Sequence, residues 1–263
     1  MHADLFDRYV AGQSPIHRLD PRVKVVVAVL FILSNVLLPD GAWLAFLLST
    51  GLALWISDLA GLGPGYTLKR SFIALPFALA AVTAIFALPG RPIAHWALGP
   101  WRLTATDTGL LRFASVVVRS WLSVQVAILL VATTQFPDLL HALGHLRVPA
   151  ILVAVISFMY RYLFVLTDEV MRLNRGREAR SARPAEGGGG GTLAWRARVA
   201  GHMAGQLFLR SYERSERVYN AMLARGYQGQ LLTLNSHEMR ARDWQVCALA
   251  VCLLVLLQIV GRL

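Results

Sequence analysis

The sequence predicts an all-α integral membrane protein with about five transmembrane helices and a polar helical domain inserted before the last of them. Hydrophobic residues make up 56% of the 263 residues and charged residues only 16%. Several apolar runs reach or approach the roughly 20 residues with which a helix crosses a bilayer. The stretch 134–243 is instead rich in arginine. These observations predict a membrane-embedded bundle joined to a water-exposed domain.

Five apolar segments are expected to span the bilayer. They are residues 23–38, 41–60, 71–89, 113–133 and 244–262, with an outer loop at 90–112. The N-terminal tail lacks a short apolar core followed by a small-residue cleavage site, so no removable signal peptide is expected. The predicted domains are therefore the tail with four helices (1–133), the polar stretch (134–243) and the last helix (244–263).

The segment 149–167 is apolar enough to suggest a further span, yet it contains Arg161. Basic residues mark cytoplasmic segments, and Arg8 and Arg18 favour a cytoplasmic N-terminus. Four spans then return the chain to the cytoplasm before 134–243, which holds fifteen arginines and nine acidic residues. A crossing at 149–167 would export those arginines. We therefore expect 149–167 to be a helix along the cytoplasmic membrane surface.

The polar stretch predicts two amphipathic helices on either side of Gly187–Gly191, five glycines expected to form a flexible loop. In the first helix, apolar residues recur every three or four positions and lead to Arg180. Gly176 is expected to bend or end this helix before the arginine. The apolar positions are Leu152, Ile156, Met159, Leu163, Leu166, Val170 and Leu173.

The second helix is expected to begin at Thr192 as N-cap and to end at Gly226, just after Arg225. Its predicted inner face comprises Phe208, Ser211, Ser215, Val218 and Met222. Its opposite face, expected to be solvated and to carry a Glu213–Arg217 pair, comprises Arg210, Glu213, Arg214 and Arg217.

Both predicted helices run into the same three-residue ending, alanine, then arginine, then a small residue. These endings are Ala179-Arg180-Ser181 and Ala224-Arg225-Gly226. An arginine suits the negative end of a helix dipole, and its planar fork can bind a carboxylate through two hydrogen bonds. A single arginine at a helix end is usually just solvated. Its repetition favours two contacts with a water-soluble partner.

Other function classes have weaker support. Lys24 and Lys69, the two lysines, belong to no phosphate-binding loop and no basic cluster, so neither ATP hydrolysis nor nucleic-acid binding is expected. His141 and His145 lack the third ligand of a familiar zinc motif, and no metal or other cofactor site is expected in this chain. An intramembrane enzyme or stand-alone carrier remains the alternative class. Arg119, inside a predicted span, is expected to reach the outer membrane surface.

Four groups of residues together resemble a known family. They are His17–Lys24, Thr133–Leu140, the Tyr160–Tyr162 neighbourhood leading to Ala179-Arg180-Ser181, and Arg210–Tyr227. The sequence resembles the transmembrane (T) components of energy-coupling factor (ECF) transporters, and most closely the CbiQ-type subunit of cobalt and nickel importers. The first Ala-Arg-small ending departs from the family pattern because Ser181 replaces glycine.

The resemblance implies a non-catalytic subunit of an ATP-driven importer in the inner membrane of a prokaryotic cell. Two cytoplasmic ATPase subunits would bind the ATP, and a CbiM-like membrane subunit, the S component, would bind the ion. A small accessory membrane subunit is an optional further partner. The implied ATPase-coupling residues are Ala179, Arg180, Ser181, Ala224, Arg225 and Gly226. Cobalt is the expected cargo; nickel or a vitamin remains the alternative, and the subunit stoichiometry stays open.

Overall fold

The computed structural model describes residues 8–87, 89–98, 101–180, 192–229 and 239–263. The chain divides into two compact units. We call Asp7–Leu146 with Asn235–Leu263 the membrane unit, and Arg147–Leu234 the crossed-helix unit. The regular structure of the described residues is helical apart from one two-stranded hairpin.

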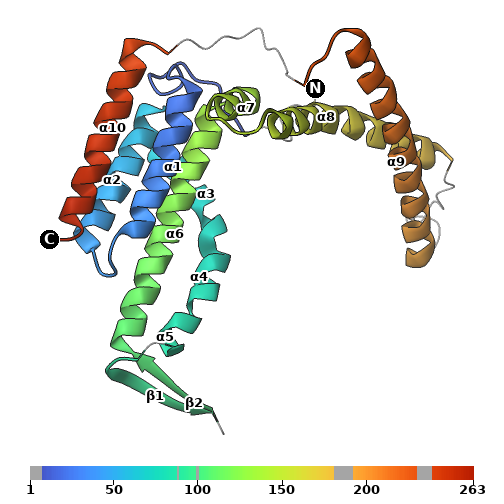
Figure 1. The fold of residues 1–263 in the computed structure, drawn as a ribbon. Helices are drawn as coiled ribbons and strands as arrows, with labels where there is room; N and C mark the ends of the chain where they lie inside the picture. The colour runs from blue at the N-terminus through green and yellow to red at the C-terminus, as the bar shows by residue number, and fades with distance from the viewer. Residues whose placement is uncertain (1–7, 88, 99–100, 181–191, 230–238) are drawn as a thin grey trace. The chain divides into compact units, whose positions relative to one another are not determined.

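The membrane unit is a bundle in which α1 (Pro21–Leu37) lies against α6 (Asp107–Thr133) and α10 (Ala241–Val260), with α2 (Trp43–Leu59) packed on both of these partners (Figure 1). Proline at the first position and an N-cap fix the start of α1. Apolar side chains from all four helices form the core, namely Phe31, Leu38, Ala45, Phe46, Leu122, Leu254 and Leu257.

The predicted spans at 23–38, 41–60, 113–133 and 244–262 correspond to α1, α2, α6 and α10. The prediction of one continuous helix over 71–89 is wrong. That region divides into the 3₁₀ turn η2 (Ser71–Ala74), α4 (Leu75–Ala81) and α5 (Thr83–Ala87), which follow α3 (Pro64–Arg70) along the side of α6.

Proline and glycine explain the broken path. Pro64 and Pro76 lie in the first turns of α3 and α4, where a missing N–H is tolerated but an uninterrupted helix through the proline is disfavoured. Gly63 has a φ of 75°, which lets the chain turn sharply after α2. The α2 helix and the segment Pro64–Ala74 consequently meet at a bend of 118°.

The expected outer loop at 90–112 contains regular structure. The strands β1 (Pro92–Leu98) and β2 (Trp101–Thr106) form an antiparallel hairpin in which Leu98 is opposite Trp101. Thr106 then caps α6, because its side chain accepts a hydrogen bond of 3.2 Å from the Gly109 amide. The hairpin therefore leads directly into the longest helix of the membrane unit.

Three described helices are long and apolar enough to cross a membrane, namely α6, α8 (Ala150–Ala179) and α10. The bent pair formed by α2 and Pro64–Ala74 is a fourth candidate. Helix α1, with 17 residues, is slightly shorter than the roughly 20 residues that a spanning helix needs. Length and composition do not distinguish a span from a helix along the surface, so the surface position of 149–167 stays a prediction.

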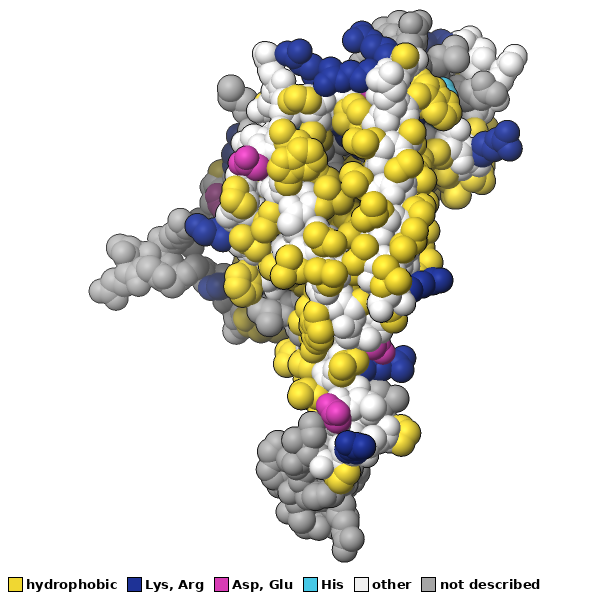
Figure 2. Space-filling view, turned by 90° about the vertical axis from the view of Figure 1, so that its left-hand side faces the viewer, with side chains coloured by type: hydrophobic (Ala, Val, Ile, Leu, Met, Phe, Trp, Pro, Cys, Tyr) yellow, Lys and Arg dark blue, Asp and Glu magenta, His cyan; other side chains and the backbone are white. Residues whose placement is uncertain are grey.

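The outer surface of the bundle matches a lipid environment. Large apolar side chains of α2 and α10 are exposed, including Trp55, Leu47 and Leu249. Figure 2 shows a broad area of hydrophobic side chains on this face, with Lys and Arg side chains gathered above it. An apolar area this large is not tolerated in water by a soluble monomer. The bundle is therefore that of an all-α, multi-pass membrane protein.

Candidate docking interface

The crossed-helix unit consists of two long helices, α8 and α9 (Leu193–Ala224), which cross one another (Figure 1). Helix α8 continues through Gly176 to Ala179, so the predicted break at Gly176 is wrong. One glycine inside a helix costs only about 1 kcal/mol, and the rest of a 30-residue helix can absorb that cost. The predicted N-cap of α9 is confirmed, because the Thr192 side chain accepts a hydrogen bond from the Trp195 amide at 3.3 Å.

The two long helices end in the same way. Ala179 is the last residue of α8 and Ala224 the last residue of α9, and Arg180 and Arg225 are the C-cap residues that follow. The amide of Arg180 donates to the Arg177 carbonyl, and that of Arg225 to the Met222 carbonyl, both at 3.1 Å. Ser181 lies outside the described residues, as do the glycines 187–191. The shared sequence ending thus corresponds, up to the arginine, to a shared helix ending.

Gly226 ends α9 as predicted. Its φ is +81°, and its amide donates to the Leu223 carbonyl at 3.0 Å. The Tyr227 amide donates to the Met222 carbonyl, also at 3.0 Å. These two bonds define a Schellman motif, in which a residue of positive φ follows the C-cap and the last carbonyls are satisfied. The small residue of the second ending therefore has a backbone function.

An ion pair joins the two helices near their middles. Glu169 of α8 accepts a hydrogen bond of 3.0 Å from Arg210 of α9, and it also pairs with Arg172 on its own helix. The Glu169 side chain is only 10% exposed, whereas that of Arg210 is 55% exposed. Burial alone would raise the pKa of Glu169, but the hydrogen bonds and charges of Arg210 and Arg172 hold that pKa below its ordinary value of 4.5.

A mostly apolar groove of about 850 Å³ lies between the first half of α8 and the second half of α9. Ala154, Phe158 and Tyr162 line it from α8, and Val218 and Met222 line it from α9. Several of its residues are exposed hydrophobics, for example Ile151 at 70%. The described residues of the crossed-helix unit therefore present exposed apolar surface along this groove.

The predicted inner face of α9 is confirmed at Ser211, Ser215, Val218 and Met222, which line the groove, but not at Phe208. Phe208 is 69% exposed, whereas Leu207 is half-buried. Arg210 and Arg214 were expected on the solvated face, yet Arg210 bonds to Glu169 and Arg214 lines the groove. The predicted Glu213–Arg217 pair is confirmed at 3.9 Å on the exposed side.

Sequence reasoning missed Glu169, although a signal was present. It lies between Leu166 and Leu173, at the spacing that places it on the predicted apolar face of α8. A carboxylate on such a face needs a partner, because burying an unpaired charge is costly. The arginines of the second helix were the available candidates.

The crossing places the two arginines on separate arms. Arg180 follows Glu169 by 11 residues and Arg225 follows Arg210 by 15, counted from the sequence. At 1.5 Å per residue, the arms extend about 16 Å and 22 Å beyond the contact. The structure does not bring Arg180 and Arg225 together at one point.

The N-terminal and central resemblance motifs meet in the membrane unit. Lys24 donates to the Thr133 carbonyl at 2.9 Å, at the end of α6, and to the His17 carbonyl at 3.2 Å. A cation at a helix C-terminus is favoured by the helix dipole. The short helix α7 (Phe136–His145) follows α6 and packs on α1. Two motifs more than a hundred residues apart therefore stabilise one helix junction.

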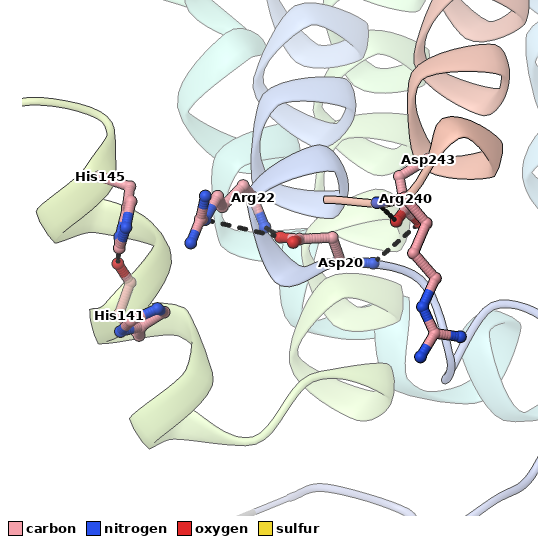
Figure 3. Close-up of polar contacts among 6 residues, drawn as sticks. All are labelled: Asp20, Arg22, His141, His145, Arg240 and Asp243. Atoms are coloured by element: carbon pink, nitrogen blue, oxygen red, sulfur yellow. Dashed lines mark hydrogen bonds and ion pairs between the residues drawn. The ribbon is translucent and has the colours of Figure 1, made fainter. Parts of the chain in front are cut away.

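One carboxylate joins the beginnings of α1 and α10. Asp243 accepts hydrogen bonds from the amides of Asp20 at 3.3 Å and Arg240 at 2.9 Å (Figure 3). Figure 3 also shows His141 and His145 on α7. Among the described residues, no group of three or more His, Cys, Asp and Glu side chains could hold a metal ion.

Polar residues inside the bundle connect helices. Arg119 forms an ion pair with Asp40 at 2.9 Å and donates to the Leu38 carbonyl at 2.5 Å, so it joins α6 to the turn between α1 and α2. Asn35 donates to the Arg119 carbonyl at 3.1 Å. These contacts give Arg119 a structural function at the turn between α1 and α2, and its reach to the outer membrane surface stays a prediction.

The lipid-facing bundle defines this chain as a multi-pass membrane protein, and its second unit consists of two long helices with basic ends. The sequence model of one protein family, described as "CbiQ: Cobalt transport protein", matches residues 12–234, which include parts of both units. The chain therefore belongs to the CbiQ cobalt transport protein family, and it is a non-catalytic transmembrane component of the ECF transporter type.

Individual relatives agree with this family. The energy-coupling factor transporter transmembrane protein EcfT of Brevibacillus brevis is 29% identical, over 95% of both chains. The EcfT protein of Lacticaseibacillus paracasei is 28% identical, over 91% of this chain and 92% of the relative. The cobalt transport protein CbiQ of Salmonella typhimurium is 26% identical, over 76% and 86% respectively.

Proposed function

We propose that this chain couples ATP hydrolysis by two cytoplasmic ATPase subunits to the movement of a substrate-binding membrane subunit. The repeated helix ending carries the proposal: two long helices of one unit each finish with alanine and an arginine C-cap. Each arm would dock in a groove of one ATPase subunit. The residues that follow the two arginines differ, Ser181 in one ending and Gly226 in the other. Two different endings suit one copy of this chain that contacts two ATPase subunits.

The chemistry of the helix ends supports docking. Both C-cap arginines are exposed, so each guanidinium is available to form two hydrogen bonds with a carboxylate of the ATPase. Ala179, Ala224 and Gly226 have little or no side chain and permit close approach, and we assign Ser181 the same function. When ATP binding closes the ATPases, the arms would follow them and transmit the displacement to the membrane subunits.

Capture of the ATPase pair by purified membranes tests this assignment. Arg180→Ala and Arg225→Ala should each weaken capture, and the double variant should abolish it, because losing one partner of a buried charge pair costs about 2–5 kcal/mol. Arg175→Ala, on the last turns of α8, is the matched control and should bind normally. Unchanged ATPase capture and ion uptake by the double variant would refute the assignment.

We infer that the cargo is cobalt ion, bound by a CbiM-like S component. The family description and the name of the Salmonella typhimurium relative support this inference. Uptake of labelled cobalt by cells that contain the whole transporter should exceed uptake of labelled nickel at equal concentration. A reversed preference would assign the system to nickel and leave the coupling function intact.

A further inference from the structure

The contact between α8 and α9 combines an apolar surface with one buried carboxylate. Apolar contact is non-directional, and side chains recur every three or four residues along both helices, so several alignments bury comparable area. A charged hydrogen bond is different, because it forms in one alignment and leaves a buried charge without its cross-helix partner in the others. At this crossing, the charged hydrogen bond is the one between Glu169 and Arg210.

We propose that Glu169 is a positioning residue, which fixes through Arg210 the point at which α8 and α9 cross and thereby the separation of Arg180 and Arg225. Its function in transport rests on the docking function proposed above. The alignment of the two helices does not depend on that function.

The two partners are unequally held. Arg172 pairs with Glu169 from the next turn of α8, so the carboxylate also has a partner on its own helix. Arg210 reaches it from α9 with a side chain that is 55% exposed. The low exposure of Glu169 and the direction of its pKa shift agree that the ionised carboxylate is stabilised in this position. Glu169 is therefore the more buried partner of the ion pair, and Arg210 is the more exposed one.

The length of the arms makes the alignment important for docking. If α9 slid along α8 by one helical turn, Arg225 would move by about 5.4 Å relative to Arg180. Hydrogen bonds to a guanidinium need donor–acceptor distances near 3 Å, so such a shift would remove one arginine from its ATPase groove while the other stayed docked. The Glu169–Arg210 contact at the crossing thus controls the two distant contacts that Arg180 and Arg225 would form with the ATPase subunits.

Distance measurements on the full-length chain test the proposal. The two native cysteines, Cys247 and Cys252, are replaced by alanine. Nitroxide labels are then attached at the exposed positions 178 and 220 through the substitutions Glu178→Cys and Asn220→Cys. In nanodiscs the wild-type alignment should give one narrow distance distribution by pulsed EPR. Glu169→Gln should broaden it or shift it by about 5 Å, the length of one turn.

Charge exchange separates positioning from general packing. Combining Glu169→Arg with Arg210→Glu should restore the narrow distribution, because the introduced carboxylate would face both the introduced guanidinium and Arg172. Glu213→Gln is the matched control, since it removes an acidic partner of an exposed pair within α9 and should leave the distribution unchanged. A wild-type distribution for Glu169→Gln, or failure of the exchanged pair to restore it, would overturn the proposal.

A second measurement uses the whole transporter. Glu169→Gln should lower the amount of ion transported per ATP hydrolysed by about tenfold, within the range of coupling energies for residues in contact. The exchanged pair should recover most of this ratio, and an unchanged ratio in Glu169→Gln would count against the use of the crossing in transport. Normal ATPase capture by the Arg180 and Arg225 double variant would instead refute the docking function, without altering the distances between labels.

Discussion

At the residue scale, Gly226 shows why a small residue follows the second arginine. Its φ of +81° lies in the region where an L side chain clashes with its own backbone, at a cost of about 1–2 kcal/mol. The space around its Cα is open, so packing against neighbours does not contribute. The glycine therefore serves to end α9 and to orient Arg225 before it.

Gly226→Ala should destabilise the end of α9 by about 1 kcal/mol because of this backbone strain. Hydrogen exchange at the amides of Gly226 and Tyr227 should accelerate accordingly. Gly201→Ala is the matched control: Gly201 lies inside α9, has open space around it and should gain about 0.5–1 kcal/mol of helix stability. Equal exchange rates in wild type and Gly226→Ala would contradict the Schellman ending.

The residues that the sequence predicts well are those with local signals. Thr192 and Gly226 act on the backbone next to them, so their residue types were sufficient. Glu169 and Arg210 act across two helices and are themselves separated by 41 positions in the chain. No local pattern states which residues of two helices meet, and Arg210 was consequently assigned to the solvated face.

At the element scale, the Glu169 carboxylate makes the α8–α9 contact sensitive to acid. Its pKa is lower in the folded protein than the ordinary value of 4.5. The ionised form therefore stabilises the contact fully above that value, and the stabilisation disappears as the pH falls through the lowered pKa. The partners that face it are Arg172 and Arg210, and both remain charged throughout this range.

We expect the distance distribution between labels at positions 178 and 220 to stay constant from neutral pH down to the ordinary carboxyl value of 4.5 and to broaden only at lower pH. Glu169→Gln should show no such transition, because it has no carboxyl group to protonate. An identical acid transition in this variant would assign the change to other groups.

Elements with a single strong pattern were also predicted well. Helices α1, α2, α6 and α10 are each a long apolar run between polar residues. The region 71–89 is equally apolar, but the proline at position 76 interrupts the backbone hydrogen bonds, which a hydropathy pattern does not detect. The hairpin of β1 and β2 depends on pairing between two short segments, so the sequence suggested no more than a loop there.

At the scale of the whole molecule, the position of α8 determines on which side of the membrane both arms lie. The first part of α8 is apolar enough to span a bilayer, yet only 6% of its most apolar window is buried inside the protein. That surface needs an apolar environment, which either a span or a position along the membrane surface provides. Whether α8 spans the membrane or lies along its surface decides on which side the two arms lie, because an additional crossing moves all the following residues to the other side.

We expect α8 to lie along the cytoplasmic surface. Nitroxides placed one by one from position 150 to 167 should then show membrane depths that oscillate with a period of about 3.6 residues. A spanning helix would instead give one depth maximum across roughly 30 Å of hydrocarbon. A cysteine at position 198 should react with an impermeant reagent added on the cytoplasmic side. A single depth maximum with labelling from outside would exclude contact between the arms and cytoplasmic ATPases.

The hydrogen bonds of Asp243 have a consequence for the biogenesis of the protein. They join the beginning of α10 to the beginning of α1, although more than 200 residues are synthesised between these two helices. The nascent bundle therefore stays incomplete until α10 has left the ribosome and entered the bilayer. Until that point, the surface of α1 that contacts α10 has no helix packed on it, and lipid or another apolar partner must cover that surface.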